Sequence, residues 1–560
     1  MNLEPANAAS ETRLTVDPAD PYEREAQTFP RLTPEQIARA ATFGAEETLP
    51  TGAALYERGE RGVDFFIVLE GKIEILDHSE DCAPTVFIAL TERQFTGELN
   101  LFNEREVLVS ARTAVESRLI RVKRADFRRL ASAETDIAEI MMRAFILRRV
   151  GMIRHGRAAV VLIGQTHDGD KIRLQRFLTR NGYPHRVLDV DADAEAGEFL
   201  DCFEIGKAHM PVVIDVRHQV LYNPSNAALA DALGLTETID PQRVHDVIVV
   251  GAGPGGLAAA VYAASEGLDT LVIEGEAPGG QAGTSSRIEN YLGFPTGISG
   301  QALAGRAQVQ AQKFGAKLAI SREVAGIDCA RNPFVLRLAG GGEVRTETLV
   351  IASGARYRKL DVEDYDRFEG HGVHYAATAM EAKLCEGEEV VVVGGGNSAG
   401  QAAVFLARQT AHVHMIVRAR DLASTMSYYL IERILASPRI TLRTQTEISR
   451  LQGGDRLSAI TWTHRESGES KTLAIANMFV MIGAAPNTGW LNGCLTLDGK
   501  GFVATGAAAG LTGSPYATSQ PGIFAVGDVR AGSTKRVASA VGEGSVVVSD
   551  VHRYLEAKRG

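Results

Sequence analysis

The sequence predicts a multidomain α/β protein with two nucleotide-binding domains in its larger part. A buried-strand pattern leads through a glycine-rich turn into a helix at residues 247–256, and the same pattern returns at residues 390–399. Before residue 130, short runs of alternating apolar residues are separated by glycines, which favours an antiparallel barrel or jelly roll. With 560 residues, the chain has room for about three or four domains.

The charge and the cysteines narrow the class of protein. A net charge of -10 argues against DNA binding, which depends on lysine and arginine at phosphates. No apolar run reaches the roughly 18 residues of a membrane span, and the first residues do not read as a secretory signal, so we expect a cytoplasmic protein. We expect no disulfide framework and no zinc site, because the cysteines form no C-x-x-C pair and lie far apart, at Cys82, Cys202, Cys329, Cys385 and Cys494.

Changes in pattern along the chain indicate the domain boundaries. Composition and turn residues mark a tail without periodicity, then strands, then alternating strands and helices. We expect a tail at 1–28, a β-barrel domain at 30–152, a small α/β domain at 157–236, the first part of a nucleotide-binding domain at 244–360, a second nucleotide-binding domain at 363–479, and the remainder of the first at 480–560.

The first glycine-rich turn follows a strand at residues 247–250 and has the form G-x-G-x-x-G. Such glycines allow a tight turn, a close approach to a pyrophosphate and close packing of helix on strand. The next strand ends in Glu274, about 20 positions on, where an acid hydrogen-bonds ribose hydroxyls. We expect a dinucleotide to contact Gly251, Gly253, Pro254, Gly255, Gly256 and Glu274.

The second turn has the form G-x-G-x-x-A and differs at the tip of its following strand. Arg418 and Arg420 stand where an acid would repel a 2′-phosphate, so we expect NADPH rather than NADH. The cofactor would contact Gly394, Gly396, Asn397, Ser398 and Ala399, together with the two arginines. No third ligand accompanies His412 and His414 on that strand, so no metal site is expected.

Further segments complete a family pattern. Residues 279–281 read Gly-Gly-Gln, residues 289–295 contain Glu-Asn and Gly-Phe-Pro, and residues 523–530 and 535–538 match two late motifs. With the two turns, they resemble flavoproteins of the thioredoxin reductase type. The resemblance implies two Rossmann-like domains and a homodimer, with FAD bound by 244–360 and 480–560 and NADPH by 363–479. The resemblance also implies that further residues bind FAD, namely Gly280, Gln281, Asn290, Gly527, Asp528, Arg536, Val537 and Ala538.

One family motif is missing. Where that family carries the redox pair C-A-T-C-D, residues 376–380 read Ala-Ala-Thr-Ala-Met. A disulfide relay needs a thiolate, which Ala376 and Ala379 cannot supply, and Met380 replaces the acid that would donate a proton. Cys385 lies nearby without a partner, so no catalytic residue is assigned.

Residues 30–152 resemble a cyclic-nucleotide-binding domain. Residues 95–102 read Phe-Thr-Gly-Glu-Leu-Asn-Leu-Phe, which matches its phosphate cassette, and Glu98 stands where the family contacts ribose. Val109 replaces the arginine that pairs with the cyclic phosphate, and Arg112 should point to the opposite strand face. We therefore expect a structural role or an altered ligand rather than a cyclic nucleotide.

Residues 157–236 resemble a thioredoxin-like fold. Met210-Pro211 precedes a strand where that fold has its cis-proline, but residues 164–170 contain no cysteine. We expect this domain to be redox-inert and used in docking or assembly.

Together these patterns predict an NADPH-dependent FAD oxidoreductase without its own redox disulfide. Hydride passes from NADPH to FAD, and electrons then pass to an unidentified external acceptor: a redox protein, a quinone or oxygen. Two alternatives stay open: a flavin- or nucleotide-responsive sensor with little turnover, and a thioredoxin-disulfide reductase.

Overall fold

The computed structural model describes residues 21–22, 24–77, 85–103, 105–156, 159–166, 168–203, 205–206, 209–285, 287–491 and 493–559. The chain divides into two compact units, which are described separately. The first contains Met1–Leu101 and Glu106–Ala159, and the second contains Phe102–Arg105 and Val160–Gly560. Of the tail expected at 1–28, residues 1–20 and 23 lie outside the described residues, whereas Glu25–Thr28 form helix α1.

The first unit is built from two antiparallel sheets of order β1-β7-β3 and β2-β6-β4-β5. Alternating apolar residues form its strands because one face of each sheet is buried. Its strands are β1 (Ala45–Leu49), β2 (Ala54–Tyr56), β3 (Phe65–Glu70), β4 (Ile73–Asp77), β5 (Thr85–Leu90), β6 (Ser110–Thr113) and β7 (Ser117–Val122). Its helices are α1, α2 (Pro34–Ala41), α3 (Arg124–Ala133) and α4 (Thr135–His155), and the 3-10 turn η1 spans Leu99–Phe102. The expected β-rich domain is confirmed.

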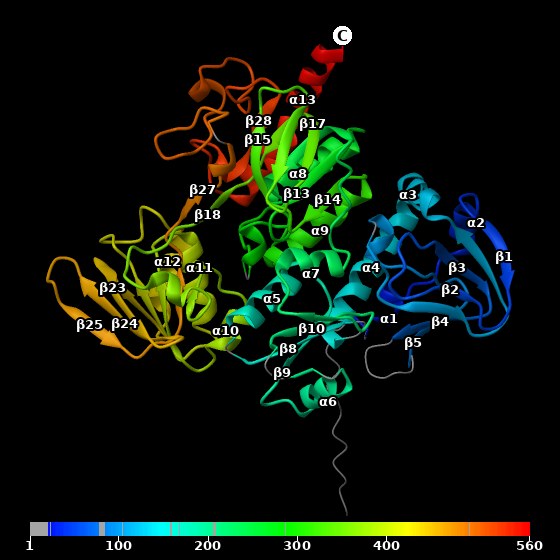
Figure 1. Cartoon of the computed structure of the whole chain (residues 1–560), viewed down its shortest axis with the longest axis horizontal. Helices are drawn as coiled ribbons and strands as arrows, with labels where there is room; N and C mark the ends of the chain where they lie inside the picture. Colours follow the sequence, from blue (N-terminus) through cyan, green and yellow to red (C-terminus); the bar gives the residue numbers. More distant parts are fainter. Residues whose placement is uncertain are drawn as a thin grey trace, which may run out of the picture. The chain divides into compact units, whose positions relative to one another are not determined.

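The second unit begins with a small mixed sheet of order β11-β10-β8-β9 (Figure 1). Strands β8 and β9 are parallel, whereas β10 runs antiparallel to both β8 and β11. The Met210–Pro211 peptide bond before β10 is cis, as expected. The elements are β8 (Val160–Gly164), α5 (Gly169–Arg180), β9 (His185–Asp189), α6 (Ala194–Cys202), β10 (Val212–Ile214), β11 (Val220–Tyr222) and α7 (Asn226–Ala232).

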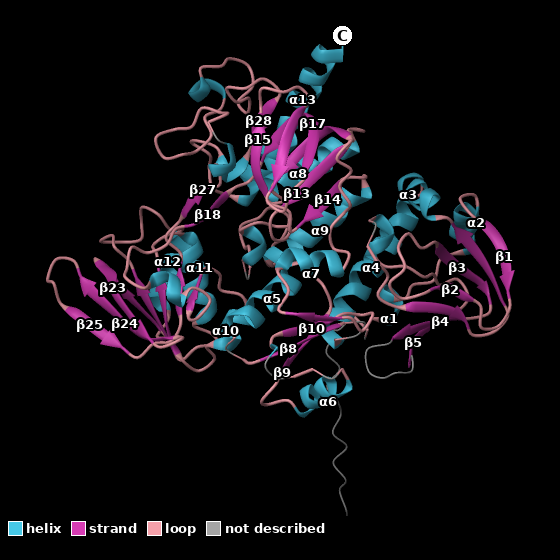
Figure 2. Cartoon of the chain, in the orientation of Figure 1, coloured by secondary structure: helices cyan, strands magenta, loops and turns pink. Residues whose placement is uncertain are grey.

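A larger sheet follows, of order β14-β13-β12-β17-β16-β15, with β28 paired to β17. Strands β12, β13, β14, β17 and β28 run parallel, and β15 and β16 add an antiparallel edge. Figure 2 shows helices beside these strands. The elements are β12 (Val244–Val250), α8 (Pro254–Ser265), β13 (Thr270–Glu274), η3 (Ala282–Thr284), α9 (Gly300–Lys313), β14 (Lys317–Ile320), β15 (Val324–Asp328), β16 (Phe334–Leu338), β17 (Glu343–Ile351), η5 (Gly489–Leu491), η6 (Gly506–Ala509), β28 (Ile523–Ala525), η7 (Gly527–Val529) and α13 (Val537–Arg559).

A second parallel sheet, of order β19-β26-β20-β21-β22, is inserted into this domain. The antiparallel pair β18 (Ala355–Tyr357) and β27 (Ala484–Pro486) carries the chain in and out of the insertion. The inserted elements are η4 (Tyr365–Phe368), β19 (Val373–His374), α10 (Ala379–Leu384), β20 (Glu389–Val393), α11 (Asn397–Leu406), β21 (His412–Ile416), α12 (Tyr428–Ala436), β22 (Ile440–Arg443), β23 (Thr446–Gly453), β24 (Leu457–His464), β25 (Ser470–Leu473) and β26 (Met478–Val480). The expected two α/β domains are thus confirmed.

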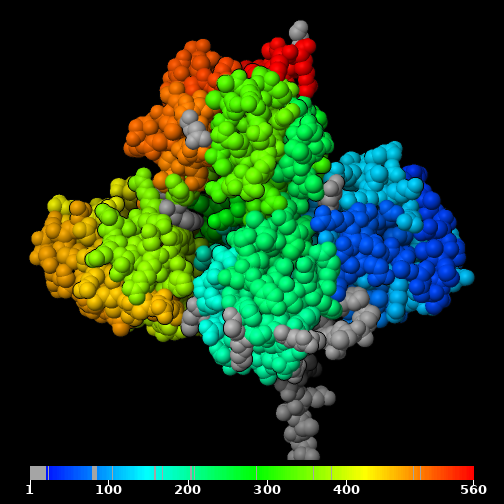
Figure 3. Space-filling view, in the orientation of Figure 1, coloured from blue at the N-terminus to red at the C-terminus, as the bar shows by residue number. Residues whose placement is uncertain are grey.

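The C-terminal helix α13 belongs to the first α/β domain, although it lies far along the chain. In Figure 3 the red C-terminal residues adjoin the green residues of that domain. Helix α13 packs on α8 at Gly255 and Gly544, where a Cβ on Gly544 would lie 2.1 Å from the Gly255 carbonyl oxygen. This close approach explains why both helices carry glycine there.

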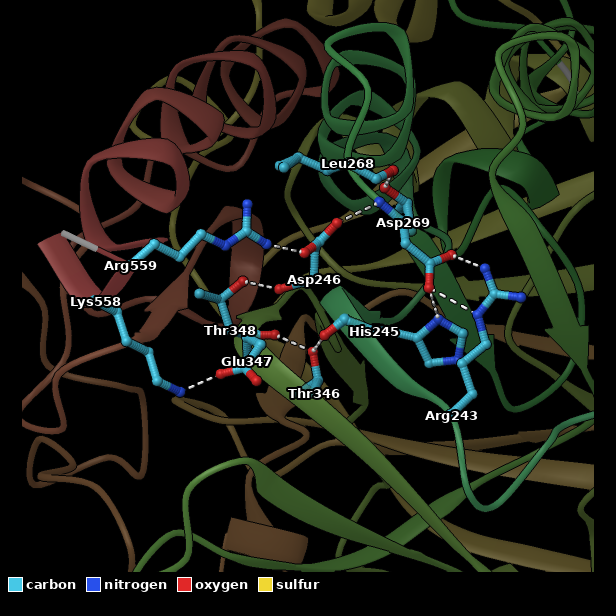
Figure 4. Close-up of polar contacts among 11 residues, drawn as sticks. Arg243, His245, Asp246, Leu268, Asp269, Thr346, Glu347, Thr348, Lys558 and Arg559 are labelled. Carbon is cyan, nitrogen blue, oxygen red and sulfur yellow. Dashed lines mark hydrogen bonds and ion pairs between the residues drawn. The ribbon is translucent and has the colours of Figure 1, made fainter. Parts of the chain in front are cut away.

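Polar contacts hold the starts of the parallel strands together (Figure 4). Nε and Nη2 of Arg243 each donate to the Asp269 carboxylate at 2.8 Å, and His245 Nδ1 lies 3.0 Å from it. Thr346 and Thr348 donate to main-chain oxygens of β12, at 3.1 and 2.6 Å. The end of α13 joins the same edge through ion pairs of Lys558 with Glu347 and of Arg559 with Asp246.

The expectation of no disulfide framework is wrong, because Cys329 and Cys494 form a disulfide with a Cα–Cα distance of 6.2 Å. Cys329 directly follows β15, and Cys494 follows η5, which packs against that strand. No local pattern in the sequence predicts this pair, because 165 positions separate the two residues and only the fold brings them together.

The disulfide lies toward the edge of the sheet where the parallel strands start. Strand register shows this, because Asp328 pairs with Val335, Val335 with Arg345, and Arg345 with Val244, the first residue of β12. The glycine-rich turn follows the other end of β12, about 20 Å along a strand of this length.

No described helix combines the length and the apolarity needed to cross a bilayer.

We predict that Asp269→Asn destabilises the protein in a pH-dependent way. Burial raises the pKa of Asp269, but the His245 ring and the Arg243 guanidinium outweigh it and lower that pKa to about 2. Because the folded value lies below the unfolded value of about 3.9, the stabilisation is present above pH 4 and is lost as the pH falls toward 2. After discounting for partial exposure, we expect a loss of about 1–2 kcal/mol at pH 7.

Thermal melts at pH 7 and pH 2.5 check this, because the difference between Asp269→Asn and wild type should shrink at the lower pH, with the exposed Asp361→Asn as control. Equal melting temperatures of Asp269→Asn and wild type at pH 7 would contradict the assignment.

Candidate functional site

The first glycine-rich turn lies between β12 and α8 and leaves no room for a side chain at Gly251 or Gly256. Gly251 has φ +102°, and a Cβ there would lie 2.4 Å from the carbonyl oxygen of Ala352. A Cβ on Gly256 would lie 1.9 Å from the carbonyl oxygen of Gly251. At Gly253, by contrast, no atom lies within 4 Å of a Cβ position, so the outer side of the turn is open. The turn has the shape that lets a pyrophosphate approach the main chain.

The N-terminus of α8 faces this open side. Its N-cap is Gly253 and Pro254 is its first residue, so no side chain caps the helix. Free N–H groups in a first helical turn, together with the helix dipole, favour an anion. The two predicted residues Gly255 and Pro254 therefore stand where a phosphate would be bound.

Glu274 ends β13 beside the turn. Its carboxylate accepts from the main-chain N–H of Ala252 at 2.6 Å and of Glu276 at 3.0 Å. Burial raises the pKa of Glu274, and the two N–H groups oppose that shift. The side chain therefore shapes the turn as well as offering oxygen atoms to ribose hydroxyls.

The Gly-Gly-Gln segment is folded against the same turn. Gly280 has φ +52°, and a Cβ there would lie 3.1 Å from Gly253 Cα. The Gln281 side chain donates to the carbonyl of Ala355. Gly280 is thus brought together with the first turn, as the sequence predicted.

Asn290 lies apart from that turn, at a cavity of about 580 Å³. The cavity is also lined by Arg408 and Arg433 of the inserted domain, and Arg433 pairs with Glu289 at 2.8 Å. The structure places Asn290 on an exposed loop and shows no side-chain hydrogen bond for it among the described residues.

The late motif follows β28, the strand beside β17. The Gly527 N–H donates to Glu543 at 2.6 Å, and Arg530 pairs with the same carboxylate at 2.7 Å. Burial raises the pKa of Asp528, which lies in the 3-10 turn η7. Arg536 and Ala538 are exposed and Val537 is half-buried where α13 begins.

The second glycine-rich turn repeats this geometry between β20 and α11. Gly394 has φ +138°, and a Cβ there would lie 2.3 Å from the Met481 carbonyl oxygen. Gly396 is the N-cap of α11, so no side chain caps that helix either. Asn397 and Ser398 open α11, and the buried Ala399 lies against Gly394.

Thr425 and Ser427 lie over this turn, although the sequence did not predict them as site residues. Thr425 donates to the Gly395 carbonyl at 2.7 Å, and the Ser427 N–H donates to the Asn397 side chain at 2.7 Å. Both contacts shape the mouth of the turn, but neither Thr425 nor Ser427 belongs to a motif, so the sequence offered no signal for them.

The two arginines at the tip of β21 differ in their surroundings. Arg420 is exposed and pairs with Glu466 at 3.0 Å. Arg418 is exposed and has no polar partner among the described residues. Arg418 is therefore the more available cation for a 2′-phosphate.

The segment that lacks the redox pair leads into α10. Its Glu381 is buried and accepts from the Thr378 N–H at 3.1 Å and from Arg176 of α5 at 3.2 Å. Burial raises the pKa of the Cys385 thiol to about 12, so this cysteine is a poor nucleophile. Within the described part of the chain, no three metal-ligating side chains cluster; His412 bonds Thr441 and His414 pairs with Glu389.

In the first unit, the phosphate-cassette residues are arranged unlike a ribose-phosphate site. Glu98 forms a two-pronged ion pair with Arg149, so its carboxylate is already engaged. Val109 lines a cavity together with Glu98, without the guanidinium that a cyclic phosphate needs.

Comparisons with known proteins agree with this geometry. A family model for pyridine nucleotide-disulphide oxidoreductases matches residues 245–544, and one for cyclic nucleotide-binding domains matches residues 46–134. The thioredoxin reductase of Treponema pallidum is 35% identical over 312 residues, which cover 56% of this chain and 97% of that protein. That of Mycolicibacterium smegmatis is 33% identical over 316 residues, with 56% and 97% covered. The structure of Lactococcus lactis thioredoxin reductase in its FR conformation is 27% identical, with a TM-score of 0.52, and covers 56% of this chain and 99% of its own.

We predict that Glu274→Ala lowers FAD affinity about tenfold or more, because a charge-assisted hydrogen bond contributes about 1.5–3 kcal/mol. Equilibrium dialysis of FAD measures this. Glu266→Ala, just past the far end of α8, is the control and should bind FAD like wild type. Unchanged FAD affinity in Glu274→Ala would show that the carboxylate only shapes the turn.

We predict that Arg418→Ala raises the KM for NADPH while leaving that for NADH unchanged. Arg420→Ala should have a smaller effect, because Glu466 already pairs with that guanidinium. Steady-state kinetics with an artificial acceptor measures both. Equal use of NADPH and NADH by the wild type would contradict the assignment of the strand tip.

Proposed function

The chain belongs to the pyridine nucleotide-disulphide oxidoreductase family, and we propose that it oxidises NADPH and delivers the electrons to an external acceptor rather than to a disulfide of its own. It is an oxidoreductase, and its cofactors are FAD and NADPH. The observation that carries the proposal is the combination of two open glycine-rich turns with alanine at positions 376 and 379.

The residues of both turns fit a bound dinucleotide. FAD, when bound, supplies the hydride-accepting and electron-transferring chemistry. Gly251, Gly253 and Gly256 admit the pyrophosphate to the main chain, and Glu274 accepts from ribose hydroxyls. At the second turn, Gly394 and Gly396 do the same for NADPH while Arg418 pairs with its 2′-phosphate. The protein's part is to bind and orient both nucleotides.

The disulfide Cys329–Cys494 does not replace the missing redox pair in this proposal. It lies toward the edge where the parallel strands start, whereas nucleotides bind outside their carboxyl ends. We assign it a structural role, because it crosslinks two segments of one domain across 165 positions.

We infer that the small sheet β8–β11 forms a thioredoxin-like, redox-inert domain. Its strand order, its parallel β8–β9 pair and its cis Pro211 support that fold. Residues 164–170 offer no cysteine where α5 begins. Helix α5 bonds α10 through Arg176 and Glu381, next to the segment without a redox pair, which supports a role in docking.

The acceptor is a redox protein, a quinone or oxygen, and a homodimer is expected. A sensor with little turnover is the second candidate, favoured by the ligand-binding type of domain at residues 46–134. Steady NADPH oxidation with one of these acceptors supports the enzyme. Tight FAD binding with negligible turnover on all of them supports the sensor.

We predict that anaerobic reduction of the wild type consumes two electrons per FAD, because no described dithiol lies near the nucleotide site to store two more. Cys329→Ser with Cys494→Ser should show the same electron count and a lower melting temperature. Spectrophotometric titration with NADPH measures the count. Four electrons per FAD in the wild type and two in the double variant would show that this disulfide has become the acceptor.

A further inference from the structure

A cavity of about 60 Å³ lies inside the first unit, lined by residues of strands β2, β4 and β5, of helix α4, and of the segments 96–100 and 107–109. Most of its wall is apolar, with Val63, Ile75, Leu90, Val107 and Val109 among its side chains. Such a wall favours an apolar ligand and penalises hydroxyls and charges that it cannot pair.

The polar side chains on the wall do not suit a sugar phosphate. Glu98 is held by Arg149, and Thr96 accepts from the N–H of Phe66 at 3.0 Å. The hydroxyls of a ribose would therefore find few free partners, and each unpaired group would cost binding free energy.

Arg148 brings one positive charge to this cavity. The side chain is only 7% exposed and lies over the rings of Phe29, Phe95 and Phe145, at 5.1, 5.0 and 5.8 Å. Its nitrogens donate to the carbonyls of Thr28, Gly97 and Phe95 at 3.0, 2.8 and 3.1 Å.

No described carboxylate forms an ion pair with this guanidinium, and burial lowers the pKa of Arg148 to about 10. It remains charged at neutral pH, and three of its five N–H groups are in use, which leaves two. Glu98 on the same wall attracts this guanidinium but is itself paired with Arg149, so an anion that entered the cavity and met the two free N–H groups would be favoured.

Asn100 adds a second polar group. Its side chain lines the cavity, is 5% exposed, and makes no hydrogen bond to any described residue. Because no described residue engages this amide, its NH₂ group is free to donate to an anionic oxygen in the cavity. Arg148 bonds two carbonyls of the segment just before Asn100, so both groups belong to one part of the wall.

We propose that this cavity binds a small amphipathic carboxylic acid, with its apolar body among the aliphatic side chains and its carboxylate on Arg148 and Asn100. Val109 and the Glu98–Arg149 pair argue against a cyclic nucleotide in this role. The first unit is then a receptor for an organic acid, fused to the oxidoreductase.

Because a cavity of about 60 Å³ admits only a few carbon atoms, calorimetric titration of the full-length FAD-loaded protein tests the proposal with propionate and butyrate, each against its neutral amide, and with cyclic AMP. At least one acid should bind with a Kd tenfold or more below that of its amide, and cyclic AMP should not bind. Asn100→Leu, which keeps the volume, should weaken that acid at least threefold, and Val109→Trp should abolish binding. The control Val115→Trp, at an exposed site outside the cavity, should bind like wild type.

Arg148→Met should remove the preference for the acid over the amide. Arg148→Met also removes three hydrogen bonds. If this variant does not fold, the Asn100 and Val109 variants test whether the cavity binds the acid. Absence of binding by both acids, equal binding of acids and amides, or cyclic AMP binding in preference to both acids overturns the proposal.

Discussion

The fold of the oxidoreductase unit depends on close main-chain contacts at glycines, where a side chain would not fit. Gly251 and Gly256 lie so close to the carbonyls of Ala352 and Gly251 that a single methyl group would force the turn apart. Gly255 and Gly544 do the same for helices α8 and α13, which lie far apart in the sequence. These contacts fix β12, α8 and α13 against one another, and the open side of the turn is what remains for a nucleotide.

The same sheet separates two kinds of interaction. The turns and Glu274 stand at the carboxyl ends of the parallel strands, where ligands of such sheets bind. The polar contacts of Asp269 and the disulfide Cys329–Cys494 stand toward the other edge, where they stabilise the domain without approaching the site. Stability and nucleotide binding can therefore be changed independently by substitution.

Much of the fold and of the site could be predicted from the sequence, because local patterns carry it. The strand–glycine–helix runs and the acid at position 274 are short-range features, and the structure brings them together as expected. The disulfide could not be predicted, since no local pattern links residues that are 165 positions apart. Nor could Thr425 and Ser427 over the second turn, or Arg148 and Asn100 in the first unit, because their roles follow from tertiary packing alone.

We propose that electrons leave the protein without passing through an internal disulfide, and anaerobic stopped-flow mixing of NADPH with the purified protein decides between the two routes. We expect flavin absorbance to fall in one phase and to stay low until an external acceptor is added. Recovery of flavin absorbance without any acceptor, or failure of NADPH to bleach the flavin, would show that the proposed route is wrong.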